Sequence, residues 1–232
     1  MILQNIARAI REQNYYAVAM EFIIVLAGVV IGFQVNGWNE RRHEAVRAAE
    51  LLERIEEEFR TFETVLTRSE RIHVEYEQAT ENVIHAIRQD AVATTDRQQM
   101  MEWLGLLRHV GRPPTRSAVY AEMISSGELS LLPAELRTEL SRFDQQIERN
   151  EYLWPEAASH LTSASALWDA VEYTSLNDPR RVTGFDPERV PLAESELEAL
   201  VIYQGALRFT ITATLESARD ILTMVEDGGG GD

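Results

Sequence analysis

Two reactive residue types, cysteine and lysine, are missing from the 232-residue sequence. Without cysteine the chain has no thiolate nucleophile, no disulfide and no cysteine ligand for zinc or an iron–sulfur cluster. Without lysine it has no Schiff-base amine, no pyridoxal-phosphate anchor and no P-loop or kinase lysine. These absences exclude several classes of enzyme.

Positive charge is also scarce. The sequence has 38 acidic residues against 22 basic ones, which gives a net charge of −16. Residues 1–39 contribute nothing to this value, because Arg8 and Arg11 balance Glu12 and Glu21. An acidic surface repels phosphate backbones, so we expect no nucleic-acid partner. The length suits one folded domain together with an anchor.

One long apolar run is present. Residues 22–33 read FIIVLAGVVIGF, and the flanking apolar residues extend the run towards the roughly 20 residues that cross a bilayer. Tyr15, Tyr16 and Trp38 lie at its two ends, where amphipathic rings prefer the lipid headgroups. We therefore expect a transmembrane helix over 16–38, with these three aromatic residues as membrane-interface anchors.

A cleavable signal peptide is the competing interpretation of the same run. The apolar stretch is followed by Gln34, Asn36 and Gly37 rather than by an A-x-A cleavage pattern, which favours a retained anchor. Residues 1–15 then form an N-terminal tail. We therefore expect the chain to be inserted in a lipid bilayer.

Polar and small residues share one face of the expected span. At 100° per residue, Glu21, Gly28, Gly32 and Asn39 fall on a single stripe. Small residues let two helix backbones approach closely, and a polar group facing another helix avoids lipid. The stripe therefore predicts a helix–helix interface and a homo-oligomer.

The stretch YYAVAMEFIIVLAGVVIGFQVNGWNERR resembles the N-terminus of an uncharacterised family of bacterial single-pass membrane proteins. The matching positions are Glu21, Gln34, Asn36, Trp38, Asn39 and Glu40. The stretch YAEMISSGELSLL at 120–132 is similar to the family's central segment. The resemblance implies a protein of the bacterial inner membrane, of unknown function and with no catalytic residues to carry over.

Arginine placement hardly decides the orientation of this span. Arg8 and Arg11 precede it, while Arg41, Arg42 and Arg47 follow it. Members of the family carry basic N-terminal tails, which implies that the bulk of the chain lies outside the cytoplasm, in the periplasm.

Residues 39–226 are expected to form an acidic, all-α, antiparallel helical bundle. Proline and glycine are absent from Asn39 to about Asp90, so the membrane helix should continue into a long helix. Apolar residues recur there in steps of three and four, as in a bundle or coiled coil. They include Ala45, Ala48, Leu52, Ile55, Phe59, Phe62, Leu66, Tyr76, Val83 and Ile87.

Shorter helices are expected after this one. A capping box places one helix start at Thr95, and others run from Ser117 to Gly127 and from Pro133 onward. The remaining expectations are a kink or restart at Pro155, an apolar helical face as far as about Ser175, a final helix and a disordered tail over 227–232. No alternating apolar pattern stands out, so no sheet is predicted.

One constellation has the spacing of a metal site. Glu70 and His73 form an ExxH pair, with Glu77 one turn further. A di-iron bundle needs a second ExxH and two more glutamates from other helices, whereas the other ExxH of the sequence, Glu40 to His43, lies on the same expected long helix. We therefore expect no metal, with His73 packed or partly exposed rather than ligating, and Glu70 and Glu77 pointing to solvent.

The other histidines have plain explanations. His85 and His160 pair with Glu81 and Glu156 four residues earlier, as on a solvated helix. His43 and His109 lie near expected helix ends, where the helix dipole favours a positive charge.

No other assembled chemistry is found in the sequence. Ser125–Gly127 suits a helix C-terminus better than a hydrolase elbow. The sequence thus predicts a membrane-anchored interaction or scaffold protein with an unidentified protein partner, no cofactor and no catalytic activity of its own. A ligand-sensing bundle that acts through a partner and a metal-dependent bundle enzyme remain as alternatives.

Overall fold

A computed structural model describes residues 15–107, 111–112, 114–173 and 182–229, of which the side chains at 15–19 and 21 are not described. The prediction of an all-α fold is confirmed. In chain order the elements are α2 (Tyr15–Arg88), α3 (Arg97–Leu106), α4 (Ala118–Ser126), η1 (Glu128–Leu131), α5 (Ala134–Ser163), α6 (Ser165–Ala170), β1 (Val171–Tyr173), β2 (Val182–Phe185), η2 (Val190–Ala193) and α7 (Glu194–Gly229).

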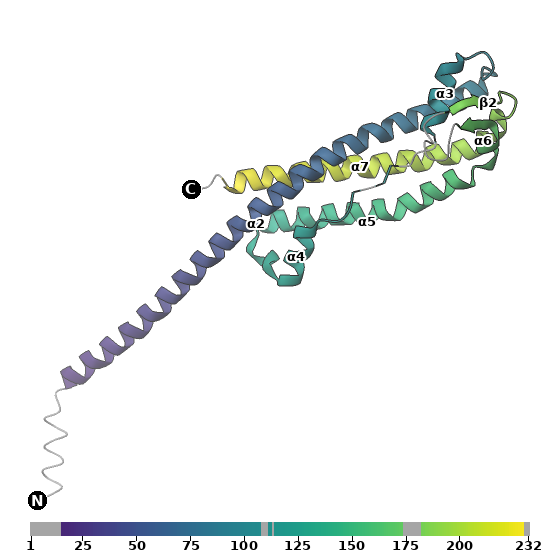
Figure 1. Ribbon diagram of the computed structural model, residues 1–232. Helices are drawn as coiled ribbons and strands as arrows, with labels where there is room; N and C mark the ends of the chain where they lie inside the picture. Colours follow the sequence, from purple (N-terminus) through teal and green to yellow (C-terminus); the bar gives the residue numbers. More distant parts are fainter. Residues whose placement is uncertain (1–14, 108–110, 113, 174–181, 230–232) are drawn as a thin grey trace, which may run out of the picture. The chain divides into compact units, whose positions relative to one another are not determined.

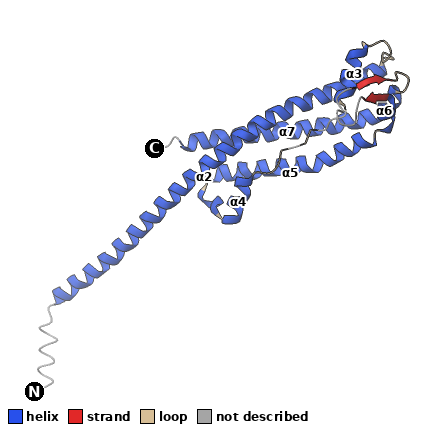
Figure 2. Cartoon of the chain, viewed as in Figure 1, coloured by secondary structure: helices blue, strands red, loops and turns tan. Residues whose placement is uncertain are grey.

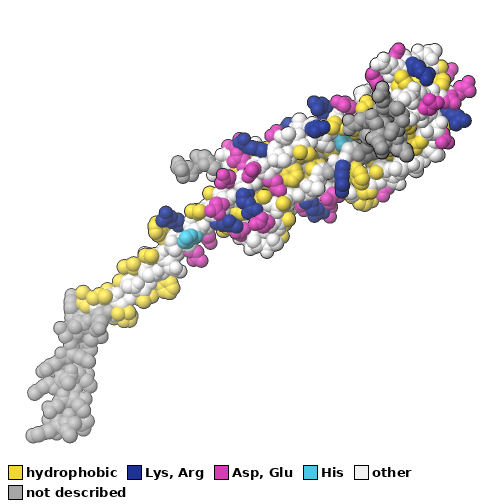
Figure 3. All heavy atoms as spheres, viewed as in Figure 1, with side chains coloured by type: hydrophobic (Ala, Val, Ile, Leu, Met, Phe, Trp, Pro, Cys, Tyr) yellow, Lys and Arg dark blue, Asp and Glu magenta, His cyan; other side chains and the backbone are white. Residues whose placement is uncertain are grey.

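The chain divides into two compact units, residues 1–50 and residues 51–232. In the first unit the described structure is helix α2, whose apolar side chains are exposed from Phe22 to Val35. Figure 3 shows these side chains in yellow along the helix. Apolar residues on every side of a helix suit a lipid environment rather than a protein core.

The second unit is a bundle of α2 from residue 51 onward, α5 and α7 (Figures 1 and 2). Helix α7 runs antiparallel to α2, because Arg88 binds Glu194 while Arg219 binds Glu63. Side-chain contacts between α5 and α7 follow the same antiparallel order. The expectation of an antiparallel bundle therefore describes this unit correctly.

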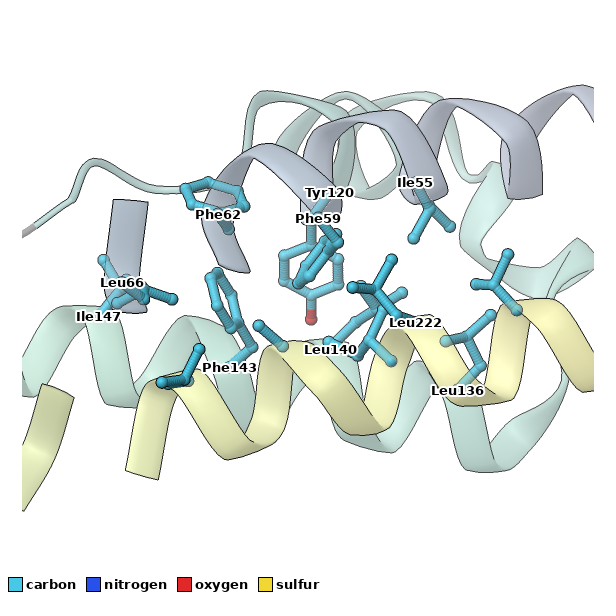
Figure 4. Close-up of a cluster of buried hydrophobic side chains, with 14 of the residues drawn as sticks. Ile55, Phe59, Phe62, Leu66, Tyr120, Leu136, Leu140, Phe143, Ile147 and Leu222 are labelled. Atoms are coloured by element: carbon cyan, nitrogen blue, oxygen red, sulfur yellow. The ribbon is translucent and has the colours of Figure 1, made fainter. Parts of the chain in front are cut away.

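One end of the bundle contains a first core built from large side chains. Phe59 and Phe62 of α2 and Phe143 of α5 pack edge to face or tilted, with ring centroids 4.7 to 5.4 Å apart. Tyr120 of α4 covers them (Figure 4). The surrounding residues of the first core include Leu51, Ile55, Leu66, Leu136, Leu140, Ile147, Ile211, Leu215 and Leu222.

The other end contains a second core under a small hairpin. Strands β1 and β2 pair antiparallel, with Val171 opposite Phe185 and Glu172 opposite Gly184. The prediction that the chain has no sheet was wrong. The prediction of an apolar helical face as far as about Ser175 was wrong as well. Val171 and Phe185 are buried in the second core, which also includes Val83, Ile84, Met100, Leu104, Leu107, Leu167, Val182, Val190 and Leu197.

Several helix ends follow local sequence rules. Ser117 caps α4 by accepting a hydrogen bond from the Tyr120 amide, and Gly127 ends it at φ +78°. That φ suits glycine, which has no Cβ to clash. Both ends were predicted, and Pro133 directly precedes α5 as expected.

Other ends differ from expectation. The cap of α3 is Asp96, whose carboxylate accepts from the Gln99 amide at 2.9 Å, rather than Thr95. Pro155 lies inside α5, which continues to Ser163 without the predicted restart. Helix α7 continues to Gly229, past the point where a disordered tail was expected. The last three residues lie outside the described structure.

Candidate functional site

The apolar segment of α2 is the first candidate site, because its described apolar side chains are exposed. Phe22 is 67 % exposed and Phe33 is 75 % exposed. Within the described residues, α2 is the one helix long and apolar enough to cross a membrane, and its apolar window is not buried at all. A core helix of a soluble protein would have these side chains buried.

The predicted interface stripe lies on this segment. A Cβ atom added at Gly28 or Gly32 would meet nothing within 4 Å, so this face is open. Asn39 is exposed, and the side chain of Glu21 lies outside what the structure describes. Of the interface anchors, Trp38 is exposed, while the side chains of Tyr15 and Tyr16 are likewise not described.

Glu70 and Glu77 of the ExxH constellation do not point to solvent as predicted. Glu70 accepts a hydrogen bond from Thr212 of α7 at 2.7 Å. Glu77 binds the guanidinium of Arg208, also on α7. The prediction was wrong because the partners of these carboxylates lie more than 130 residues later in the sequence.

His73 hydrogen-bonds to the backbone rather than to the two carboxylates. Its side chain is buried, as predicted, and its Nδ1 lies 2.8 Å from the Ser69 carbonyl oxygen, one turn earlier in α2. Burial lowers the pKa of His73 below the ordinary value of 6.5, while hydrogen bonds to the backbone of Ser69 and Gly111 act in the opposite direction. The neutral imidazole is therefore the form that the bundle holds.

The carboxylates instead belong to a ladder between α2 and α7. Glu63 accepts from Arg219 at 3.0 Å, so Glu63, Glu70 and Glu77, spaced seven residues apart, all bind α7. Among the described residues, no group of three His, Asp or Glu side chains is arranged to hold a metal ion. The ladder is a contact between helices rather than a converging ligand set.

The remaining histidines occupy ordinary surroundings. His160 stacks on Tyr203 of α7 with ring centroids 4.4 Å apart, a tertiary contact that its spacing from Glu156 did not predict. His85 and His43 are exposed, and His109 lies outside the described residues.

A buried polar layer separates the two cores along the helices. Asn150 of α5 donates to Thr214 at 3.1 Å and accepts from Thr210, both on α7. Thr80 of α2 donates to the Gln204 side-chain oxygen at 2.7 Å. With His73, these five residues form the polar layer, and all of them are buried. The apolar spacing rules found the cores on either side but not the layer.

The larger surface hollows in the described part of the bundle are each lined by one helix, while a smaller hollow of about 290 Å³ lies between α2 and α7 and is lined largely by charged side chains. One hollow of about 590 Å³ is lined only by residues 134–145 of α5. Another of about 490 Å³ is lined only by residues 64–74 of α2. Ligand sites usually converge from several elements around an apolar concavity.

Comparisons of the chain with models of known families, with curated proteins and with solved structures found no match. Function has to be inferred from the residues themselves.

Proposed function

We propose that the chain is a membrane-anchored interaction or scaffold protein of the bacterial inner membrane. Residues 16–38 cross the bilayer once, and the acidic bundle binds protein partners outside the cytoplasm. The protein has no catalytic activity of its own.

The exposure of the apolar segment carries this proposal. From Phe22 to Val35 the large apolar side chains are exposed, whereas those of the bundle are mostly buried. Exposure of so many apolar side chains on one helix is unfavourable in water and favourable in a bilayer. The resemblance of the exit motif at 34–40 to a bacterial membrane family supports the same assignment.

A scaffold role rests on the character of the bundle. The carboxylates of its metal-like constellation bind α7, and its central polar groups bind one another. Such groups stabilise the arrangement of helices. An acidic surface over a rigid bundle suits binding to another protein better than it suits chemistry.

Self-association through the anchor is the second part of the proposal. Gly28 and Gly32 leave an open strip on the helix, and Asn39 lies on the same face. A second α2 can approach closely along this strip. Gly28→Leu or Gly32→Leu should then weaken oligomers of the full chain in mild detergent. Unchanged sedimentation of both variants would reject this interface.

The anchor itself is tested with charged substitutions. Arginine at the centre of a membrane helix costs about 2.5–3.5 kcal/mol, so Val25→Arg together with Val30→Arg should remove the chain from carbonate-washed membranes. Val74→Arg, at an exposed valine of the bundle, is the matched control and should stay in the membrane fraction. If the double variant stays there as well, the span is wrong.

The orientation is tested by proteolysis of intact spheroplasts. Protease added outside should degrade residues 40–232 while the cytoplasm stays closed. Protection of this region would place the bundle in the cytoplasm and reject the proposed topology.

A further inference from the structure

An unusual phenylalanine lies on the last helix. The sequence has seven phenylalanines, and four of them are buried in the two cores. Phe22 and Phe33 belong to the apolar segment. Phe209 is 68 % exposed on α7, in the middle of the acidic bundle.

Phe209 is part of a continuous apolar strip. Ile202, seven residues earlier, is 69 % exposed and lies on the same side of α7. Three half-buried alanines alternate with these two residues in steps of three and four. We call this set the outer strip, and it consists of Ala199, Ile202, Ala206, Phe209 and Ala213.

Among the described residues, the hydrogen bonds, ion pairs and ring contact that join α7 to α2 and α5 do not involve side chains of the outer strip. Helix α7 meets α2 through Arg208 and Thr212, and it meets α5 through Tyr203 and Thr210. Its core residues face inward between these two edges. At 100° per residue, the outer strip lies on the opposite side of α7 from the core.

We propose that a second copy of this chain covers the outer strip, with the two α7 helices side by side and parallel. Apolar residues in steps of three and four are what a two-helix seam uses. The alanines let the helices approach, while Ile202 and Phe209 each meet the same residue of the second copy. In a two-fold pair whose axis runs along the two helices, each residue of the strip meets its own counterpart.

The distribution of charged residues favours this face of α7 for a contact between identical chains. Two copies with a net charge of −16 repel each other over most of their surfaces. Between Ala199 and Ala213 the only charged residue is Arg208, which is held by Glu77. Between residues 199 and 213 the strip therefore contains no carboxylate, and it is bordered by Glu198, which binds Arg88, and by the exposed Glu216.

The size of the strip shows that it works together with the anchor. A stable interface buries about 800 Å² on each partner, and two large side chains with three alanines supply only part of this area. Copies confined to one membrane have a much higher effective concentration, which lets a small contact form. The inference thus rests on the proposed anchor and adds a second contact to the proposed self-association.

Disulfide cross-linking tests the inference cleanly, because the chain has no cysteine of its own. Ile202→Cys and Phe209→Cys are each introduced into the full chain in membranes and oxidised. Tyr152→Cys is the control, since Tyr152 is 73 % exposed on α5. We expect about tenfold more disulfide dimer at positions 202 and 209 than at 152, because tethering amplifies a specific contact.

The result distinguishes this inference from the proposed function. Equal dimer yields at all three positions would overturn the outer-strip contact. Dimers that form only when Ile202→Cys and Phe209→Cys chains are mixed would overturn the parallel pairing. The amount of protein in the membrane fraction of the same samples tests the anchor separately. Membrane-bound protein that gives no cross-links at positions 202 and 209 would therefore reject the outer-strip contact and leave the proposed anchor standing.

Discussion

Helix α2 contains two apolar regions that differ in how their side chains are exposed. In residues 22–35 apolar side chains surround the helix, and those described are exposed. In residues 51–66 a set of apolar side chains recurs every three or four positions and is buried, with charged residues between its members: Leu51, Ile55, Phe59, Phe62 and Leu66. The first pattern suits a helix whose surroundings are apolar, and the second suits a helix with one apolar side in water.

The comparison shows where each region gains its stability. The apolar region over 22–35 depends on what surrounds the chain, while the region over 51–66 depends on α5 and α7 of the same chain. Equivalent substitutions in residues 15–50 and in the bundle should therefore affect unfolding of the bundle differently. Phenylalanine, asparagine, histidine and arginine occur in both regions, so the same substitution can be compared between them.

Phenylalanine gives the largest expected contrast. Phe59 is fully buried and packs against Phe143 with centroids 4.7 Å apart, so Phe59→Ala should lower the free energy of unfolding by about 3–5 kcal/mol. Phe33→Ala, at an exposed residue, should leave it nearly unchanged. Urea unfolding of the full chain in detergent measures both, and equal losses would contradict the comparison.

Asparagine gives the next contrast. Asn150→Ala removes the partner of Thr210 and Thr214 in the buried layer, which should cost about 1–3 kcal/mol of unfolding free energy. Asn39→Ala, at an exposed residue, should change it by less than about 0.5 kcal/mol. Replacing Asn150, Thr210 and Thr214 together by apolar residues should recover part of the loss. A triple variant less stable than Asn150→Ala would show that the layer is not a pairwise hydrogen-bond set.

Histidine gives a contrast in pH dependence. Burial lowers the folded-state pKa of His73, so below about pH 6.5 the unfolded chain binds a proton that the folded chain resists. The contribution of His73 to stability is full above pH 6.5 and declines as pH falls, by at most about 1.4 kcal/mol per pH unit.

The measurement compares unfolding of the normal chain and of His73→Gln between pH 8 and pH 5. The advantage of the normal chain should shrink towards acid. His43→Gln, at an exposed residue, serves as the control. A constant difference between the normal chain and His73→Gln would show that His73 has the same pKa in both states.

Arginine gives the smallest contrast. The side chain of Arg219 is half exposed and binds Glu63 at 3.0 Å, so Arg219→Ala should cost less than about 1 kcal/mol. Arg42 lies 5.9 Å from the centre of the Trp38 ring, and Arg42→Ala should leave unfolding of the bundle unchanged. Thermal unfolding of both variants at low and high salt measures these effects. A large loss of stability for Arg219→Ala would show that the ladder stabilises the bundle more than its exposure suggests.

Local rules predicted much of this fold. Ser117 and Gly127 bound α4 because a capping side chain and a left-handed glycine act within a few residues. The apolar spacing of 51–87 also placed Phe59, Phe62 and Leu66 correctly in a core. Such features depend on neighbours in the sequence.

Features that depend on distant residues were missed. Strand β1 has three residues, and the spacing of Trp168 and Val171 is also compatible with a helix, so its pairing with β2 left no local pattern. Glu70 and Glu77 were expected in solvent because nothing near them reveals Thr212 and Arg208. The outer strip had a weak signal, since Ile202 and Phe209 lie off the apolar face of α7.

The carboxylate ladder limits how α2 and α7 can slide along each other. Glu63, Glu70 and Glu77 recur every seven residues, or about two helical turns, and each holds a different donor on α7. An axial displacement of one turn, about 5.4 Å, would break all three contacts together. Axial sliding of α2 along α7 is therefore opposed by all three contacts at once.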